Sequence, residues 1–170
     1  LAEWKWDGIR AQILRRGASL AIWSRGEDLL TDRFPEITAA ASVELPEGCV
    51  LDGELLCWRD GDKRPLDFSV MQTRIGRQRL GAATLARAPA VFVAFDCLEH
   101  EGRDLRERTL GERRAALQQI LGSRPQGSRL RLAEELPATE IADWAAWRAR
   151  AREHGAEGLM IKRRESRYGI

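Results

Sequence analysis

Six residues near the start of the chain, Lys5-Trp6-Asp7-Gly8-Ile9-Arg10, bring together an amine, an acid, a glycine and a guanidinium. Lys5 is a candidate nucleophile, because an amine that has lost its proton can attack phosphorus. A free lysine is protonated at neutral pH, so we expect desolvation, or a cation such as Arg10 or Lys162, to lower the pKa of Lys5. Gly8 would permit a tight turn or a close backbone approach to a phosphate. Taken alone the pattern is weak, since a lysine and an aspartate at a turn usually form an incidental surface pair.

Carboxylates that could hold a metal ion occur far downstream, at Asp52, Glu54 and Glu157. Side chains of a strand alternate between its two faces, so a strand over residues 50–56 places Asp52 and Glu54 together, opposite apolar residues. Mg²⁺ takes oxygen ligands and few protein carboxylates. Asp52 and Glu54 could therefore hold this ion directly or through water, and Glu157 offers a further carboxylate. The alternative is a paired charge cluster at the end of a strand.

The segment from Glu157 to Lys162 repeats this mixture of charged and apolar residues. A strand over residues 158–163 would direct Met160 and Lys162 to one face and Leu159 and Ile161 into the core. Charged groups flanked so closely by apolar residues need partners or a ligand.

Two further side chains could contact a nucleotide. Arg25, in Ser24-Arg25-Gly26, follows a predicted strand, where its guanidinium could reach a ribose or a phosphate. Its alternative is an ordinary turn. Phe95 lies in an apolar run just before Asp96 and could stack on a base, although a core phenylalanine is the default expectation.

The elements that must position these residues follow from periodicity and from turn and capping residues. We predict a helix over residues 32–42, with Thr31 or Asp32 as its cap and Pro35 in its first turn. We also predict that Thr109 and Glu112 form a capping box and that Gly155 ends the last helix. Because the elements do not alternate regularly as βαβ units, we predict an α+β fold with antiparallel sheets and flanking helices. The predicted strands are 9–15, 19–24, 49–58, 90–98, 129–133 and 158–163, and the predicted helices are 32–42, 67–75, 109–121 and 139–154.

Composition adds bounds but no strong functional signal. The 170 residues are enough for one domain with a hydrophobic core, and a net charge of +2 does not by itself indicate a polyanionic partner. Cys49, Cys57 and Cys97 are odd in number and lie in apolar runs, which favours buried reduced thiols and a cytoplasmic location. The sequence has no signal-peptide pattern and no apolar run long enough to span a membrane. We expect a domain cut at both ends from a longer, monomeric protein.

Taken in order, these segments resemble the nucleotidyltransferase motifs of ATP-dependent DNA ligases, in the style of the bacterial enzymes. Glu3 to Arg10 resembles the adenylation motif, Ser24-Arg25-Gly26 the arginine motif, and Leu51-Asp52-Gly53-Glu54 the acidic motif. Ala94-Phe95-Asp96-Cys97-Leu98 resembles the aromatic motif, and Glu157-Gly158-Leu159-Met160-Ile161-Lys162 is the most discriminating match. The resemblance implies an ATP-grasp-like adenylation domain over residues 1–170, without the N-terminal DNA-binding domain and the C-terminal oligonucleotide-binding-fold (OB-fold) domain of such enzymes.

The resemblance also implies a reaction and a role for each residue. Lys5 would attack the α-phosphorus of ATP and carry AMP, which then passes to the 5′-phosphate of nicked double-stranded DNA before the 3′-hydroxyl seals the strand. Lys162 would lie against the α-phosphate. The nucleotide would be bound by Glu3 at the adenine edge, by Phe95 and Met160 on the two faces of the ring, and by Arg10, Arg25 and Glu54 around the ribose and nick phosphate. Glu54 and Glu157 would serve Mg²⁺ or Mn²⁺.

Two alternatives stay open. An mRNA capping guanylyltransferase shares the lysine chemistry with guanine as its base, but Glu3 and the Glu157–Lys162 segment favour a DNA ligase, and they disfavour an RNA ligase for the same reason. A non-catalytic DNA-binding module with vestigial motifs is disfavoured by the near-neutral charge, because binding to phosphates needs a basic face.

Overall fold

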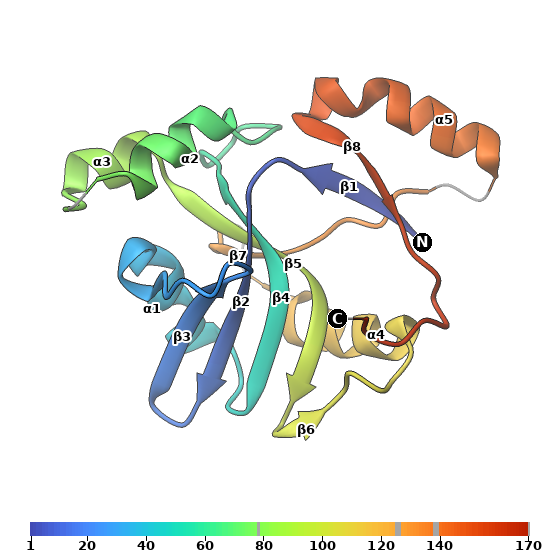
Figure 1. Cartoon of the computed structure of the whole chain (residues 1–170), viewed down its shortest axis with the longest axis horizontal. Coiled ribbons are helices and arrows are strands. Elements are labelled where there is room, and N and C mark those ends of the chain that lie inside the picture. Colours follow the sequence, from blue (N-terminus) through green and yellow to red (C-terminus); the bar gives the residue numbers. More distant parts are fainter. Residues whose placement is uncertain (78, 125–126, 138–139, 170) are drawn as a thin grey trace.

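A six-stranded sheet forms the centre of the protein in the computed structural model, which describes residues 1–77, 79–124, 127–137 and 140–169. Its strand order is β3-β2-β4-β5-β6, with β7 paired to β5 (Figure 1). Neighbouring strands run antiparallel except for β5 and β7, which are parallel. The strands are β2 (Ile9–Arg16), β3 (Ser19–Ser24), β4 (Cys49–Cys57), β5 (Ala90–His100), β6 (Arg103–Asp104) and β7 (Leu130–Leu132).

The first and last strands form a separate two-stranded sheet beside this one. Strand β1 (Ala2–Trp6) pairs antiparallel with β8 (Ala156–Ile161), so that Glu3 faces Met160 and Lys5 faces Gly158 across the ladder. The chain then bends from β1 into β2 of the central sheet (Figure 1). This pairing brings β1, at the start of the chain, and β8, near its end, together beside the central sheet.

In the described part of the chain, five helices surround the two sheets: α1 (Pro35–Glu44), α2 (Phe68–Ile75), α3 (Ala82–Arg87), α4 (Leu110–Leu121) and α5 (Ile141–Arg150). Helix α1 contacts β2, β3 and β5, and α4 contacts β5 and β7. Ile13, Leu51, Phe92 and Leu117 are completely buried in the main core that results. Helix α5 contacts β8, and Trp4 of β1 packs with Trp147 of this helix in a second cluster.

Most of the predicted elements are present, and the predicted α+β class with flanking helices is confirmed. The capping box of Thr109 and Glu112 is formed, and Gly155 has the left-handed conformation of a cap, with φ of 73°. Strands β1 and β6 and helix α3 were not predicted. The parallel pairing of β7 is the exception to the predicted antiparallel arrangement.

Three local predictions were wrong. Neither Thr31 nor Asp32 caps α1, because both lie in a short 3₁₀ turn where the Thr31 hydroxyl accepts a hydrogen bond from the Ile22 amide at 3.0 Å. Helix α5 ends at Arg150 and the chain continues to His154 as a 3₁₀ turn, so this helix is shorter than predicted. Strand β8 ends at Ile161, which is 53% exposed, so this side chain is not in the core.

Gly8 is required where the chain crosses from β1 to β2. A Cβ atom at this position would lie 2.5 Å from the Leu55 carbonyl oxygen and 2.8 Å from Cγ of Glu54. Real Cβ atoms do not approach other atoms so closely, so the glycine lets the bend lie directly against β4. The close approach that we predicted at Gly8 is therefore made to a neighbouring strand.

Two expectations from composition can be compared with the fold. Cys49, Cys57 and Cys97 are buried free thiols, and burial raises the pKa of the Cys57 thiol to about 11. Among the described residues, no helix is long and apolar enough to cross a bilayer.

Candidate active site

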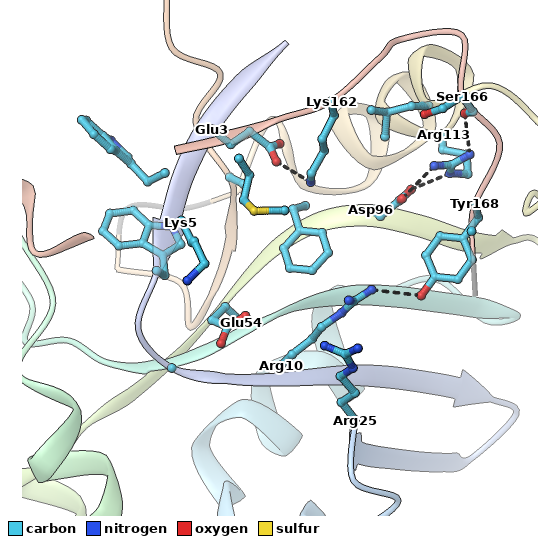
Figure 2. Close-up of a pocket in the computed structure, with 18 of the residues that line it drawn as sticks. Glu3, Lys5, Arg10, Arg25, Glu54, Asp96, Arg113, Lys162, Ser166 and Tyr168 are labelled. Carbon is cyan, nitrogen blue, oxygen red and sulfur yellow. Dashed lines mark hydrogen bonds and ion pairs between the residues drawn. The ribbon is translucent and has the colours of Figure 1, made fainter. Parts of the chain in front are cut away.

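A cleft of about 460 Å³ opens between the two sheets. The small sheet contributes residues from β1 and β8, and the central sheet contributes residues from β2, β4 and β5 (Figure 2). Every residue to which the ligase resemblance gives a role lines this cleft, although these residues are spread over almost the whole chain. They are Glu3, Lys5, Arg10, Arg25, Glu54, Phe95, Glu157, Met160 and Lys162.

Lys5 lies at the mouth of the cleft, with its side chain 51% exposed. Its Nζ donates a hydrogen bond to Glu157 of the facing strand, and this bond and the carboxylate charge raise the pKa of Lys5. The expectation of a lowered pKa was therefore wrong for this arrangement. The reason is that the predicted cations point elsewhere, since Arg10 pairs with Asp52 and Lys162 pairs with Glu3.

Glu3 lies deep in the cleft between two cations. Glu3 is only 2% exposed, and Lys162 donates a hydrogen bond from Nζ to Oε2 of Glu3 at 2.6 Å (Figure 2). Arg114 of helix α4 approaches the other oxygen, with Nη1 2.9 Å from Oε1. A buried carboxylate needs such partners, because an isolated charge is costly to remove from water.

Phe95 is half-buried and lines the cleft. Nζ of Lys162 lies 4.4 Å from the ring centroid, and the guanidinium carbon of Arg10 lies 5.6 Å from it. Met160, across the ladder from Glu3, is 43% exposed and lines the same cleft. An aromatic face and a thioether in one cleft can together hold a flat apolar ring.

Glu54 enters the cleft from the middle of β4. Burial raises the pKa of its carboxyl to about 7; the Arg10 guanidinium opposes this shift, whereas the nearby carboxylates Asp52 and Asp7 add to it. Near neutral pH the group therefore exchanges readily between its neutral and ionised forms.

Asp52, two residues earlier on β4, is completely buried in a polar network. Arg10 donates to its two carboxylate oxygens, from Nη2 at 2.8 Å and from Nε at 3.3 Å. The Tyr168 hydroxyl donates to Oδ2 of Asp52 at 2.7 Å, and burial followed by this bond raises the pKa of Tyr168. Asp52 thus orients Arg10 toward the cleft and is itself fully engaged, so the alternative of a paired charge cluster describes Asp52 better than a metal ligand does.

Residues 163–169 form a strap that closes one side of the cleft. The first amides of α4 hold it, since Leu110 and Gly111 donate to the carbonyls of Ser166 and Arg164, each at 2.8 Å. Arg113 of the same helix is buried and binds both carboxylate oxygens of Asp96, at 2.7 and 2.9 Å (Figure 2). The strap carries Tyr168 to its position beside Arg10.

The carboxylates fit a magnesium site that the nucleotide would complete. No group of three or more His, Cys, Asp or Glu side chains that could hold a metal ion occurs within residues 1–77, 79–124, 127–137 and 140–169. Glu54 and Glu157 nevertheless both line the cleft. Mg²⁺ is commonly held by one or two carboxylates together with substrate phosphates, and this donor set matches that use.

Sequence reasoning gave no role to Tyr168, Arg113 or Arg114. The two arginines lie within a predicted amphipathic helix, where charged residues are normally solvated, and the chain contains 28 lysines and arginines. A run of two arginines at the start of a helix gives no indication that both side chains turn inward. Tyr168 is the one tyrosine of the chain, and its position shortly after Lys162 was the signal in the sequence that could have placed it near the cleft.

Comparisons with known proteins agree with this arrangement. A family model described as an ATP dependent DNA ligase domain matches residues 1–170. DNA ligase C2 of Mycolicibacterium smegmatis is 43% identical over 120 residues, which cover 70% of this chain and 33% of that protein. DNA ligase C of Mycobacterium tuberculosis is 35% identical over 161 residues, which cover 94% of this chain and 44% of that protein.

A solved structure of mycobacterial DNA ligase D complexed with ATP and MES is 30% identical, with a TM-score of 0.75 over 99% of this chain and 49% of that chain. The chain therefore spans less than half the length of these relatives. The likeness confirms both the predicted family and the predicted adenylation-domain fold.

Proposed function

The chain belongs to the family of ATP-dependent DNA ligase domains, and from this premise we propose that it adenylates its own Lys5 with ATP and passes the AMP to a nick in double-stranded DNA. The observation that supports this most strongly is the meeting of two lysines, a buried carboxylate and an aromatic face in one cleft. The parent protein would then be a DNA ligase, and this domain would carry its covalent chemistry.

The adenine ring would enter between Phe95 and Met160, with its 6-amino group toward Glu3. A carboxylate only accepts hydrogen bonds, and an amino group can donate one, so the pair is complementary. Lys162, which now lies over Phe95 and against Glu3, has a flexible side chain that could turn to the α-phosphate. Arg10 and Arg25 would then face the ribose and the phosphate of the nick.

In the first step, the Lys5 ammonium separates from Glu157 and releases a proton. Its Nζ forms a bond to the α-phosphorus, and the bond from this phosphorus to the pyrophosphate oxygen breaks on the opposite side. Lys162 neutralises the charge that develops on the α-phosphate oxygens, and the cleft fixes the line of attack. Glu54 and Glu157 would hold Mg²⁺ or Mn²⁺, which would supply further charge neutralisation when bound.

In the second step, a 5′-phosphate oxygen of the nick attacks the same phosphorus, and the bond from it to Nζ of Lys5 breaks. In the third, the 3′-hydroxyl attacks the 5′-phosphorus, loses its proton and displaces AMP. A groove of about 710 Å³ adjoins the cleft and is lined by Arg10, Arg25, Trp23, Arg106 and Tyr168. Its guanidinium groups suit the phosphates of a DNA strand.

Intact-mass measurement after incubation with ATP and Mg²⁺ tests the first step. We expect an AMP adduct in the wild-type chain and none in Lys5→Ala, with GTP giving little adduct in comparison. The same measurement on this chain followed by an OB-fold domain of a related ligase shows whether the isolated chain lacks only a helper domain. Absence of the adduct in both proteins would favour the non-catalytic DNA-binding module, and an adduct with GTP alone would favour the guanylyltransferase.

A further inference from the structure

Helix α4 carries a side chain next to Glu3 that none of the ligase-like motifs contains. Arg113 of this helix lines the cleft and holds the strap, whereas the next residue, Arg114, pairs with Glu3 of the cleft wall. The guanidinium of Arg114 is only 10% exposed. Its Nη2 donates to the Ala133 carbonyl oxygen at 2.9 Å, so its position is fixed from the side opposite Glu3.

The contact between Arg114 and Glu3 is unusual in its geometry. Nη1 and Oε1 are 2.9 Å apart, which makes them an ion pair, yet their angles do not satisfy a hydrogen bond. Within the described part of the chain, Oε1 accepts no hydrogen bond, although its side chain is only 3% exposed. A buried carboxylate oxygen that faces a cation but accepts no hydrogen bond keeps unused acceptor capacity, which a donor on a ligand could use.

The second partner of Glu3 is Lys162, which we expect to leave this carboxylate in the proposed reaction. Lys162 now holds Oε2 at 2.6 Å, but the α-phosphate of ATP would compete for this lysine. Once Lys162 turns to the phosphate, Arg114 is the cation left beside Glu3 among those that this structure describes at its carboxylate. Its hydrogen bond to the Ala133 carbonyl oxygen holds the Arg114 guanidinium beside Glu3 when Lys162 moves away.

We propose that Arg114 is a positioning residue for base selection, which holds the Glu3 carboxylate in the orientation that accepts a hydrogen bond from the 6-amino group of the nucleotide. This inference rests on the proposed lysine adenylation and adds to it the source of the preference for a 6-aminopurine. A Glu3 side chain without this guanidinium can rotate toward other donors, and it then no longer distinguishes the amino group.

The test compares two nucleotides that differ only at position 6 of the purine. ATP carries the amino group, and purine riboside 5′-triphosphate carries a hydrogen atom in its place. We expect wild-type Lys5 to form its adduct about 10- to 100-fold faster with ATP, the range for one hydrogen bond to a charged group. Rates are read from intact mass at subsaturating nucleotide with Mg²⁺ present.

In Arg114→Gln we expect the rate with ATP to fall toward that with purine riboside triphosphate, which changes little, so that their ratio shrinks to about 3-fold or less. Arg114→Lys keeps a charge without the fork and should give an intermediate ratio. The matched control is Arg108→Gln, whose side chain is 65% exposed and forms a loose ion pair with Glu112 at 3.8 Å. It should keep the wild-type ratio.

The ratio of the two rates does not depend on how much of a sample is folded, so it stays informative if a variant is less stable. Equal losses with both nucleotides in Arg114→Gln, with an unchanged ratio, would show that Arg114 only supports the fold. An absence of adduct in the wild-type chain, alone and joined to the OB-fold domain, would instead refute the adenylation on which the inference depends. The two failures are therefore distinguishable.

Discussion

Replacement of Glu54 by glutamine should change how the stability of the protein depends on pH. Glu54 lies in the cleft wall, where burial raises the pKa of its carboxyl from the ordinary value of 4.5 to about 7. The folded protein therefore holds this proton more tightly than the unfolded chain does. Stability associated with the group is fully present below pH 4.5 and is lost as the pH rises to about 7, after which no further loss occurs.

The size of the effect follows from the distance between the two pKa values. A difference of one pH unit corresponds to about 1.4 kcal/mol, so the wild-type protein should lose about 3 kcal/mol of unfolding free energy through Glu54 between low pH and pH 8. Solvent at the cleft mouth reduces this figure, and we expect about 2 to 3 kcal/mol. Glu54→Gln has a similar shape and no charge to lose. Its stability should be close to that of the wild type at pH 4 and higher by this amount at pH 8.

Urea unfolding followed by circular dichroism at pH 4, 5, 6, 7 and 8 measures the difference, because the titration of other groups is common to both proteins. Glu107→Gln is the matched control, since this side chain is 84% exposed and pairs only at the surface with Arg167. It should follow the wild type across the whole range. A constant difference between Glu54→Gln and the wild type, or a difference that grows toward acid, would refute the argument that burial controls this carboxyl.

Two further substitutions test how the cleft is built. Gly8→Ala should lower the unfolding free energy by about 1 to 3 kcal/mol, because the added methyl group would lie 2.5 Å from the Leu55 carbonyl oxygen. Thermal and urea unfolding measure this change. The control is Gly158→Ala, where nothing lies within 4 Å of the added methyl group, and its stability should change little. Tyr168→Phe removes the hydroxyl that donates to Asp52 at 2.7 Å and should lower the unfolding free energy by about 1 to 3 kcal/mol while slowing transfer of AMP to nicked DNA; an unchanged protein in both assays would mean that the strap does not hold Asp52 and Arg10 in place.

The members of the cleft could be predicted from the sequence because their chemistry is visible there. Lys5, Glu54, Phe95 and Lys162 each lie in a short segment whose residue types suggest a role. Strand alternation adds which neighbours within one strand share a face, such as Met160 and Lys162. The prediction did not need their distances in space. It also did not need strand β1, which was missed although its five residues, Ala2–Trp6, alternate between apolar and charged side chains.

What the sequence did not provide is the pairing among charges. Lys5 was expected beside a cation and lies beside Glu157, because the facing strand brings an acid within reach across the ladder. Arg114 and Tyr168 meet Glu3 and Asp52 over more than a hundred residues of chain. Local patterns carry no information on such contacts, since they depend on how two sheets and a helix are placed relative to one another.

The pairing of the first strand with the last also has a consequence for the order in which the protein folds during synthesis. Lys5 leaves the ribosome early, but its partner Glu157 is 152 residues away. At about 5 to 20 residues per second, the nascent chain spends roughly ten seconds or more with β1 unpaired. The hairpins of the central sheet can form in that interval, whereas the cleft cannot exist until β8 has been made. Until β8 has been made, Lys5 has no cleft around it, so the adenylation that we propose would become possible only after that strand is complete.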